Sequence, residues 1–251
     1  MNFKNKVCII TGGANGIGKH TVEAFLKAGA KVAFIDIDEE AGKQLALGYP
    51  QESLLFIVGD IAEESALNDF VKKVVVKFEK VDYLINNACI GKGGIKSGCS
   101  FEEFNYVLKL GITAPYMLSK LLLDNFNSGA SIINISSTRS KMSQENTESY
   151  SAAKGGISAL THALSISLAH KVRVNSISPG WIETGEIKHS EEDNAQHPVG
   201  RVGNPMDIVK MIMFLCSEEA SFITGQDMVV DGGMSKLMIY HNDLGWSFNN
   251  K

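Results

Sequence analysis

Short apolar runs alternate along this chain with longer segments in which apolar residues recur at helical spacing. Most of the short runs are almost continuously apolar, which is typical of parallel strands buried on both faces. Seven strands are therefore predicted, at 6–11, 31–36, 53–59, 81–86, 130–136, 172–178 and 226–230. The segments between them predict helices at 17–28, 39–47, 63–78, 101–127, 150–169 and 206–216.

This alternation predicts an α/β fold: a doubly wound parallel sheet of about seven strands with helices on both faces, which is the Rossmann architecture. Residues 1–251 contain no repeat, linker or low-complexity segment, so we expect a single domain. Residues 91–100 are glycine-rich and predict a loop. Residues 185–198 are polar and predict a short flap over a substrate, because ligands bind beyond the carboxyl ends of such strands.

Composition excludes several classes of function. The net charge of −4 and the 21% of charged residues give no sign of a surface that binds nucleic acid. The amino terminus lacks the features of a signal peptide, and no apolar run approaches the roughly 18 residues that span a bilayer. The four cysteines have neither the spacing of metal ligands nor that of a disulfide framework, which indicates reduced thiols. The six histidines are dispersed and indicate no metal site. We therefore expect a cytoplasmic protein with no membrane partner.

A glycine-rich loop follows the first predicted strand. Gly12, Gly16 and Gly18 form a G-x-x-x-G-x-G pattern at the junction with the first helix. Glycines let the backbone turn sharply and approach a pyrophosphate, which the helix amino terminus then binds through its N–H groups. The alternative is a glycine-rich turn that only packs the strand against the helix. Its position at the first strand–helix junction favours a dinucleotide site.

Asp36 ends the second predicted strand. A carboxylate there accepts hydrogen bonds from the adenosine ribose and repels a 2′-phosphate. Neither Asn15 in the loop nor Ile37 offers the positive charge that such a phosphate needs, so NAD is predicted rather than NADP. The alternative is that Asp36 caps the next helix, a role for which Asp38 is an equal candidate.

Polar residues and turn formers also follow later strands. Asp60 and Ile61 end the third strand, and Asn86 and Asn87 end the fourth. These residues lie at the edge where a nucleotide binds, although helix caps and side-chain-stabilised turns explain each of them equally well. After the sixth strand come Pro179, Gly180 and Thr184, for which a simple chain reversal is a sufficient explanation.

Tyr150 and Lys154 lie four residues apart in a predicted helix, on one face. The lysine ammonium stabilises a phenolate at such a spacing, which makes the tyrosine usable as an acid or base. Ser137, at the end of the fifth strand, offers a hydroxyl that holds a substrate oxygen while the tyrosine transfers its proton. Alone, a Y-x-x-x-K pattern is weak, and a serine at a strand end is usually a turn former.

Together these motifs resemble the short-chain dehydrogenase/reductase family, in its compact branch, from residue 6 to about residue 235. The family's T-G-x-x-x-G-x-G corresponds to residues 11–18, its N-N-A-G to 86–89 and its P-G turn to 179–180. Its catalytic serine and Y-x-x-x-K correspond to Ser137, Tyr150 and Lys154. Residues 201–205 and 224–233 also look like this family.

The resemblance implies an NAD-dependent oxidoreductase that interconverts a secondary alcohol and a ketone. In it Tyr150 is the general acid/base, Lys154 assists Tyr150 and binds the nicotinamide ribose, and Ser137 orients the substrate oxygen. The remaining cofactor contacts implied are Gly12, Asn15, Gly16, Ile17, Gly18, Asp36, Asp60, Ile61, Asn87, Pro179, Ile182 and Thr184.

Two departures from the family pattern bear on function. Cys89 replaces the last glycine of N-N-A-G, and Gly111 replaces an asparagine whose backbone carbonyl is thought to link the lysine to solvent through water. The second departure leaves open an alternative, a catalytically impaired dinucleotide-binding sensor or scaffold. Two further alternatives fit less well: a sugar-nucleotide epimerase has another glycine spacing, and an enoyl reductase has tyrosine seven residues before the lysine, where Thr147 stands.

The sequence does not identify the substrate. Trp181, Arg139, Gln144 and Glu183 are expected either to line its pocket, which indicates polar groups on the substrate, or simply to face solvent. The resemblance also implies a homotetramer, with the tail at 236–251 near an interface. That tail carries apolar side chains that are hard to leave exposed on a monomer, namely Met238, Ile239, Tyr240, Trp246 and Phe248.

Overall fold

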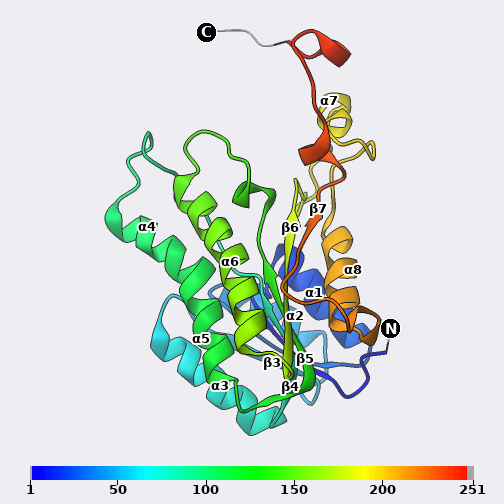
Figure 1. Ribbon diagram of the computed structural model, residues 1–251. Coiled ribbons are helices and arrows are strands. Elements are labelled where there is room, and N and C mark those ends of the chain that lie inside the picture. The colour runs from blue at the N-terminus through cyan, green and yellow to red at the C-terminus, as the bar shows by residue number, and fades with distance from the viewer. Residues whose placement is uncertain (1, 248–251) are drawn as a thin grey trace.

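The computed structural model describes residues 2–247 (Figure 1). All strands are parallel and form one sheet in the order β3-β2-β1-β4-β5-β6-β7. The order reverses between β1 and β4, which is where ligands bind in sheets of this kind. The strands are β1 (Val7–Thr11), β2 (Lys31–Asp36), β3 (Leu54–Val58), β4 (Val81–Asn86), β5 (Phe126–Ile135), β6 (Val172–Pro179) and β7 (Asp227–Val230).

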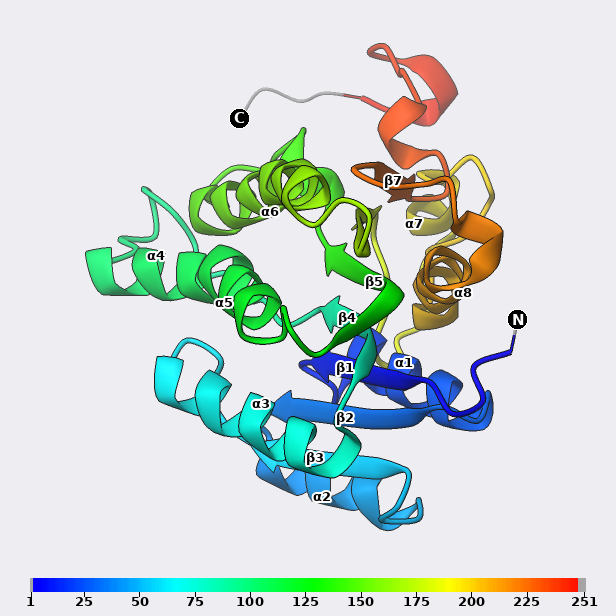
Figure 2. The same cartoon turned by 60° about the horizontal axis from the view of Figure 1, so that its bottom comes forward.

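Helices cover both faces of the sheet, as Figure 2 shows. One layer contains α1 (Gly16–Lys27), α2 (Glu39–Leu47) and α8 (Pro205–Cys216). The other contains α3 (Glu64–Phe78), α4 (Phe101–Leu108), α5 (Ala114–Leu121) and α6 (Glu148–Ser167). The predicted doubly wound Rossmann fold is thereby confirmed.

Each face of the sheet has its own hydrophobic core. Successive strand residues point to opposite faces, so Ile9 of β1 belongs to the core under α3, α5 and α6, and Ile10 to the core under α1 and α8. Both side chains are fully buried. This two-sided burial explains why the strands read as continuous apolar runs in the sequence.

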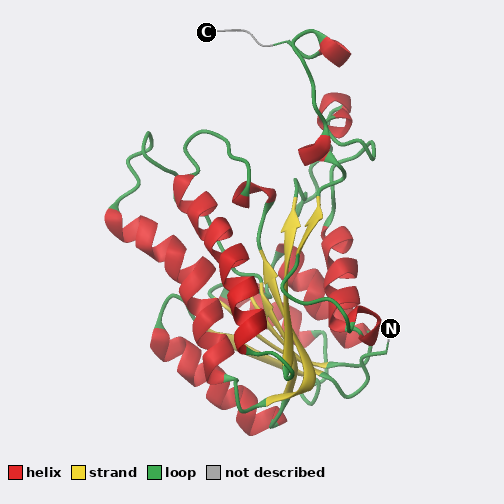
Figure 3. Cartoon of the chain, viewed as in Figure 1, coloured by secondary structure: helices red, strands yellow, loops and turns green. Residues whose placement is uncertain are grey.

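The helix predicted at 101–127 is wrong as one element. It consists of α4, a π-helical turn η1 (Lys109–Thr113) and α5, and it ends at Leu121. Figure 3, coloured by secondary structure, shows the helices on either side of the strands. The fifth strand begins at Phe126 rather than at residue 130, because Phe126 is buried and pairs with Val81 of β4. The remaining predicted strand and helix boundaries lie within two residues of the observed ones.

Irregular segments extend beyond the carboxyl ends of the strands. Residues 91–100 form a loop, as predicted. Residues 185–198 contain a short helix α7 (Glu191–Ala195), and 3₁₀ turns lie at η4 (Met234–Lys236) and η5 (Asp243–Gly245). Figure 1 shows the last of these turns projecting away from the body of the domain. Among residues 2–247, no helix has the length and apolar character needed to cross a membrane.

Candidate active site

Three adjoining cavities, with volumes of about 580, 280 and 390 Å³, lie at the carboxyl edge of the sheet. The first two share Ser137, Tyr150, Gly180 and Ile182 in their linings. The second and third share Cys89. The cavities therefore form one continuous groove, with the Ser137–Tyr150 pair where the first cavity meets the second.

The glycine-rich loop lies at the third cavity and has a conformation that requires glycine. Gly12 and Gly16 have φ angles of +67° and +53°, in the left-handed region that other residues rarely adopt. A Cβ atom on Gly18 would lie 1.8 Å from the Gly12 carbonyl oxygen, so only glycine lets the helix start this close to the loop. The Asn87 amide holds the loop, donating to the carbonyl oxygens of Thr11 (3.1 Å) and Gly12 (3.0 Å).

Asp36 is bound to the glycine-rich loop and not to the helix that follows it. Its carboxylate accepts hydrogen bonds from the backbone N–H of Ala14 (2.9 Å) and of Asp38 (3.0 Å). The capping role belongs to Asp38, whose side chain accepts from the Ala41 N–H at the start of α2. That bond, and a second from the Asn15 amide, lower the pKa of the Asp38 carboxyl.

The lining of the third cavity carries negative charge and no positive charge. Asp36, Asp38 and Asp60 all contribute to it, and neither lysine nor arginine does. Asn15, Ile37 and Ile61 also line this cavity. A 2′-phosphate placed beside Asp36 would therefore meet like charge without a compensating cation.

Asp60 has a partner that the sequence did not indicate. Its carboxylate accepts from the Ala62 N–H (2.9 Å) and from the hydroxyl of Tyr106 on α4 (2.9 Å). Burial, together with this hydrogen bond to a carboxylate, raises the pKa of Tyr106 to about 12. Asn86, by contrast, is buried in the core, where its amide donates to Asn134, and it does not line the groove.

Ser137, Tyr150 and Lys154 converge at the second cavity. Ser137 directly precedes the 3₁₀ turn η2 (Thr138–Ser140), and Tyr150 and Lys154 lie one turn apart near the start of α6. The Lys154 Nζ atom lies 5.3 Å from the centre of the Tyr150 ring and donates to the Ile135 carbonyl at 2.6 Å. Lys154 is only 3% exposed, so its charge acts inside the protein, where screening by water is weak.

Gly111 lies in the π-helical turn η1 and packs against α6. A Cβ atom at this position would lie 2.8 Å from the Cβ of Ala153 and 3.3 Å from the Cys89 sulfur. The glycine therefore lets α4 and α5 approach the α6 segment that carries Lys154. An asparagine would require this contact to open.

The last residue of β6, Pro179, and the segment that follows it close the second cavity from the opposite side. Pro179, Gly180, Ile182 and Thr184 line it. Ile182 is held by a backbone bridge to Gly203. A Cβ atom on Gly16 would lie 3.3 Å from the Thr184 methyl group, so the segment after β6 packs against the glycine-rich loop.

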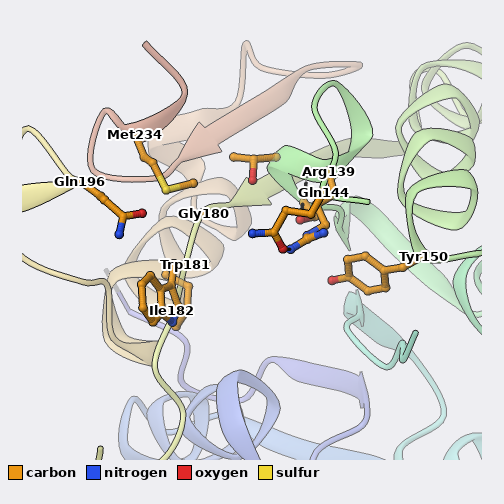
Figure 4. Close-up of a pocket in the computed structure, with 10 residues that line it drawn as sticks. Arg139, Gln144, Tyr150, Gly180, Trp181, Ile182, Gln196 and Met234 are labelled. Carbon is orange, nitrogen blue, oxygen red and sulfur yellow. Dashed lines mark hydrogen bonds between the residues drawn. The ribbon is translucent and has the colours of Figure 1, made fainter. Parts of the chain in front are cut away.

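The first cavity, of about 580 Å³, opens on the other side of Tyr150. Of the four residues expected to line the substrate pocket, Arg139, Gln144 and Trp181 do so. Glu183 does not, because it pairs with His189 (3.2 Å) and accepts from the Gly185 N–H. Gln196 and Met234 also line this cavity, facing the Tyr150 hydroxyl across it (Figure 4), and no motif in the sequence indicated either of them.

The groove suits a nicotinamide dinucleotide. At its glycine-rich end neither Gly12 nor Gly18 has room for a side chain: an added Cβ atom on Gly12 would lie 2.9 Å from the Ala88 Cβ, and one on Gly18 would lie 1.8 Å from the Gly12 carbonyl oxygen. The loop backbone there is therefore bare, as close approach of a pyrophosphate requires. Three carboxylates, which are groups suited to accept hydrogen bonds from ribose hydroxyls, line the third cavity, and a tyrosine, a serine and a lysine line the second. Among the residues described, no group of three or more His, Cys, Asp or Glu side chains is arranged to hold a metal ion.

Comparison with known proteins defines the class. A family model described as "Enoyl-(Acyl carrier protein) reductase" matches residues 12–235. The chain belongs to the short-chain dehydrogenase/reductase family, and it is an oxidoreductase of that family.

Individual relatives span almost the whole chain. An "uncharacterized oxidoreductase" of Thermotoga maritima is 41% identical, over 95% of this chain and 99% of its own. L-fucose dehydrogenase of Mus musculus is 36% identical over 92% and 89%, and 3-oxoacyl-[acyl-carrier-protein] reductase of T. maritima is 31% identical over 93% and 99%. The structure of an apo SCOR enzyme from Clostridium thermocellum superposes with a TM-score of 0.93, at 46% identity, covering 98% of this chain and all of the other.

Proposed function

We propose that this protein is an NAD-dependent oxidoreductase that interconverts a secondary alcohol and a ketone. The observation that carries the proposal is the meeting of Ser137, Tyr150 and Lys154 at the second cavity, where Ser137 and Tyr150 also line the first. A substrate in the larger cavity would reach Tyr150 from one side. A nicotinamide ring in the smaller cavity would face the same point from the other side.

In this proposal Tyr150 is the general acid/base. Its hydroxyl gives a proton to the substrate oxygen during ketone reduction, and its phenolate accepts that proton during alcohol oxidation. The buried Lys154 ammonium stabilises the phenolate through space and binds the nicotinamide ribose. Ser137 donates to the substrate oxygen and fixes its orientation. The bound dinucleotide supplies or accepts the hydride.

The remaining predicted contacts are proposed to hold the cofactor along the groove. Asp60, Ile61 and Asn87 would flank the adenosine, and Ile182 and Thr184 would hold the carboxamide end. The loop and the turn after β6 would complete the site through Gly12, Asn15, Gly16, Ile17, Gly18, Asp36 and Pro179.

We propose NAD rather than NADP because of the charge around Asp36. Asp36 and Asp38 are adjacent carboxylates at the ribose end, and no cation lines the cavity there. Both carboxylates are held by backbone N–H donors, so they cannot turn away without losing those bonds.

Two alternative functions receive less support. An enoyl reductase fits the description of the matched family model, but Thr147 stands at the tyrosine position expected for that chemistry. The hypothesis of a catalytically impaired scaffold is based on Gly111. The close contact with Ala153 explains a glycine at this position, and Tyr150 and Lys154 remain close to each other.

We further propose a cytoplasmic homotetramer acting on small molecules. All four cysteines are free, which favours a reducing compartment. Met238 and Tyr240 in the tail are 75% and 64% exposed, which favours burial against another subunit. Phe248, also expected at that interface, lies outside the described residues. Light scattering would report the mass of the assembly directly.

The test of the proposed function is a spectrophotometric panel of secondary alcohols and ketones. Each is assayed at 340 nm with NAD(H) and NADP(H) in parallel. The proposal expects turnover of at least one alcohol–ketone pair, faster with NAD(H). Tight dinucleotide binding with no turnover across the panel would favour the scaffold instead.

A further inference from the structure

Arg139 is the charged residue of the first cavity, the one that opens beside Tyr150 away from Lys154. The other nine lining residues are neutral, and they include Ser137 and Tyr150. The adjoining inner cavity adds Lys154 and no carboxylate. A substrate that reaches Tyr150 from this side therefore enters a space with positive charge and no negative charge in its lining.

No carboxylate among residues 2–247 is paired with the charge of Arg139. The chain has three arginines. Arg201 makes two hydrogen bonds of 2.7 Å to the carboxylate of Asp207, and Arg173 donates to the carbonyl oxygens of Ile223 and Ser217. Arg139 forms no ion pair with any described residue; its Nη2 donates to the neutral Gln144, and its buried Nη1 has no hydrogen-bond partner there.

Arg139 has a fixed position relative to the reacting centre. Its backbone N–H donates to the Ser137 hydroxyl at 3.2 Å, within the turn η2. Its side chain extends into the cavity beside Gln144, and the Tyr150 hydroxyl faces the same space (Figure 4). A group bound by Arg139 would therefore lie in the same cavity as the substrate oxygen that Ser137 and Tyr150 hold.

Gln144 completes a pair of donors. Because an arginine only donates, the Gln144 oxygen must be the atom that faces it, which leaves the amide NH₂ free to donate. A guanidinium beside an amide NH₂ matches the two oxygens of a carboxylate. A phosphate is a weaker match, because sites for it commonly combine several cations or a helix amino terminus, and this lining has one cation.

We propose that the substrate is a hydroxy acid and its keto acid, and that Arg139 and Gln144 bind its carboxylate. This rests on the proposed function and names the substrate class of the same site. In the oxidative direction the hydroxyl proton passes to the Tyr150 phenolate, and the carbinol C–H bond breaks with transfer of hydride to NAD⁺. The products are the keto acid, NADH and one proton released to solvent.

Matched substrate pairs test the proposal. The 2-, 3- and 4-hydroxypentanoates are compared with their methyl esters, which keep the alcohol and remove the charge. For at least one pair, kcat/KM is expected to favour the acid by about 10- to 100-fold, the range given by a hydrogen-bonded charge. Arg139→Met should remove most of that preference by raising KM for the acid far more than KM for the ester. Arg139→Lys should retain part of the preference for the acid, since lysine keeps the positive charge but lacks the paired N–H donors of the guanidinium.

A binding measurement gives a second readout that does not depend on turnover. In a Trp246→Phe background the remaining tryptophan is Trp181, which lines the cavity. Pentanoate added to the NAD complex should change its fluorescence at concentrations at least 10-fold below those needed for pentanamide. Arg139→Met should abolish this difference, while NADH affinity and the circular dichroism spectrum stay unchanged.

Failure of this inference is distinguishable from failure of the proposed function. If neutral secondary alcohols and esters are oxidised as well as the acids, and Arg139→Met lowers all of them equally, the function stands and the carboxylate site is wrong. Arg139 would then serve only to hold Gln144 near the turn η2 through their hydrogen bond. If no acid, ester or neutral alcohol is turned over with either cofactor, both proposals are overturned.

Discussion

Gly111 and Ala153 are in contact so close that position 111 has no room for a Cβ atom, which would lie 2.8 Å from the Ala153 Cβ. The contact joins the π-helical turn between α4 and α5 to the helix that carries Tyr150 and Lys154. The absence of the family's asparagine here is therefore part of how this chain packs η1 against α6.

Gly111→Ala is expected to lower the free energy of unfolding by about 1–3 kcal/mol, because it overpacks this contact. Ala153→Gly in the same chain should recover part of the loss, giving a measurable coupling energy. The coupling energy is measured by urea unfolding of the wild type, the two single variants and the double variant. Gly155→Ala is the control: the nearest atom to its added Cβ is 3.9 Å away, so it should stabilise α6 by up to about 1 kcal/mol. Additive effects at 111 and 153 would show that the contact is unimportant.

Asp36→Ala is expected to reduce the preference for NAD over NADP by about 10-fold or more, because it removes the charge that repels a 2′-phosphate. Fluorescence titrations with NADH and NADPH measure the ratio of the two dissociation constants. The ratio is the informative quantity, since Asp36 also binds the Ala14 N–H and a disturbed loop weakens both cofactors alike. An unchanged ratio would remove Asp36 from cofactor discrimination.

Asp207→Asn is expected to lower the free energy of unfolding by about 1 kcal/mol at neutral pH. Hydrogen bonding to Arg201 lowers the pKa of the Asp207 carboxyl in the folded protein. The stability it contributes is therefore fully present above the unfolded pKa of about 4 and is lost as the pH falls through the lower folded value.

The difference between wild type and Asp207→Asn should accordingly be constant from pH 5 to 8 and shrink below about pH 4. Thermal unfolding across that range measures it. Asp69→Asn serves as the control, because Asp69 pairs with Lys73 on the exposed surface of α3 and should contribute only about 0.3–0.5 kcal/mol. A difference of the same size at pH 3 and pH 7 would contradict the role given to Arg201.

The fold was largely predictable from the sequence because buried parallel strands leave continuous apolar runs. The break in the helix after residue 108 was not, since a π-helical turn keeps much of the helical spacing that the pattern detects. The start of β5 was missed because the polar Asn127 and Ser128 follow its buried first residue, Phe126.

Some residues of the candidate site could be predicted from the sequence, and others could not. Ser137 and Tyr150 could be named because they belong to a set of ordered motifs that together resemble one family, whereas the spacing of each motif alone is weak evidence. Tyr106, Gln196 and Met234 could not, because tertiary packing brings them to the groove from segments with no distinctive pattern. The unmatched charge of Arg139 was equally invisible, since the sequence does not say which acidic residues lie nearby.

The most direct test of the central claim is the turnover of Tyr150→Phe with the best alcohol from the panel. The variant keeps the ring above Lys154 and loses only the hydroxyl, so NADH affinity should stay within about 2- to 3-fold of wild type. Without the proton-transfer group, kcat should fall by on the order of 10²- to 10⁴-fold. Turnover at the wild-type rate, with the cofactor bound normally, would contradict the account.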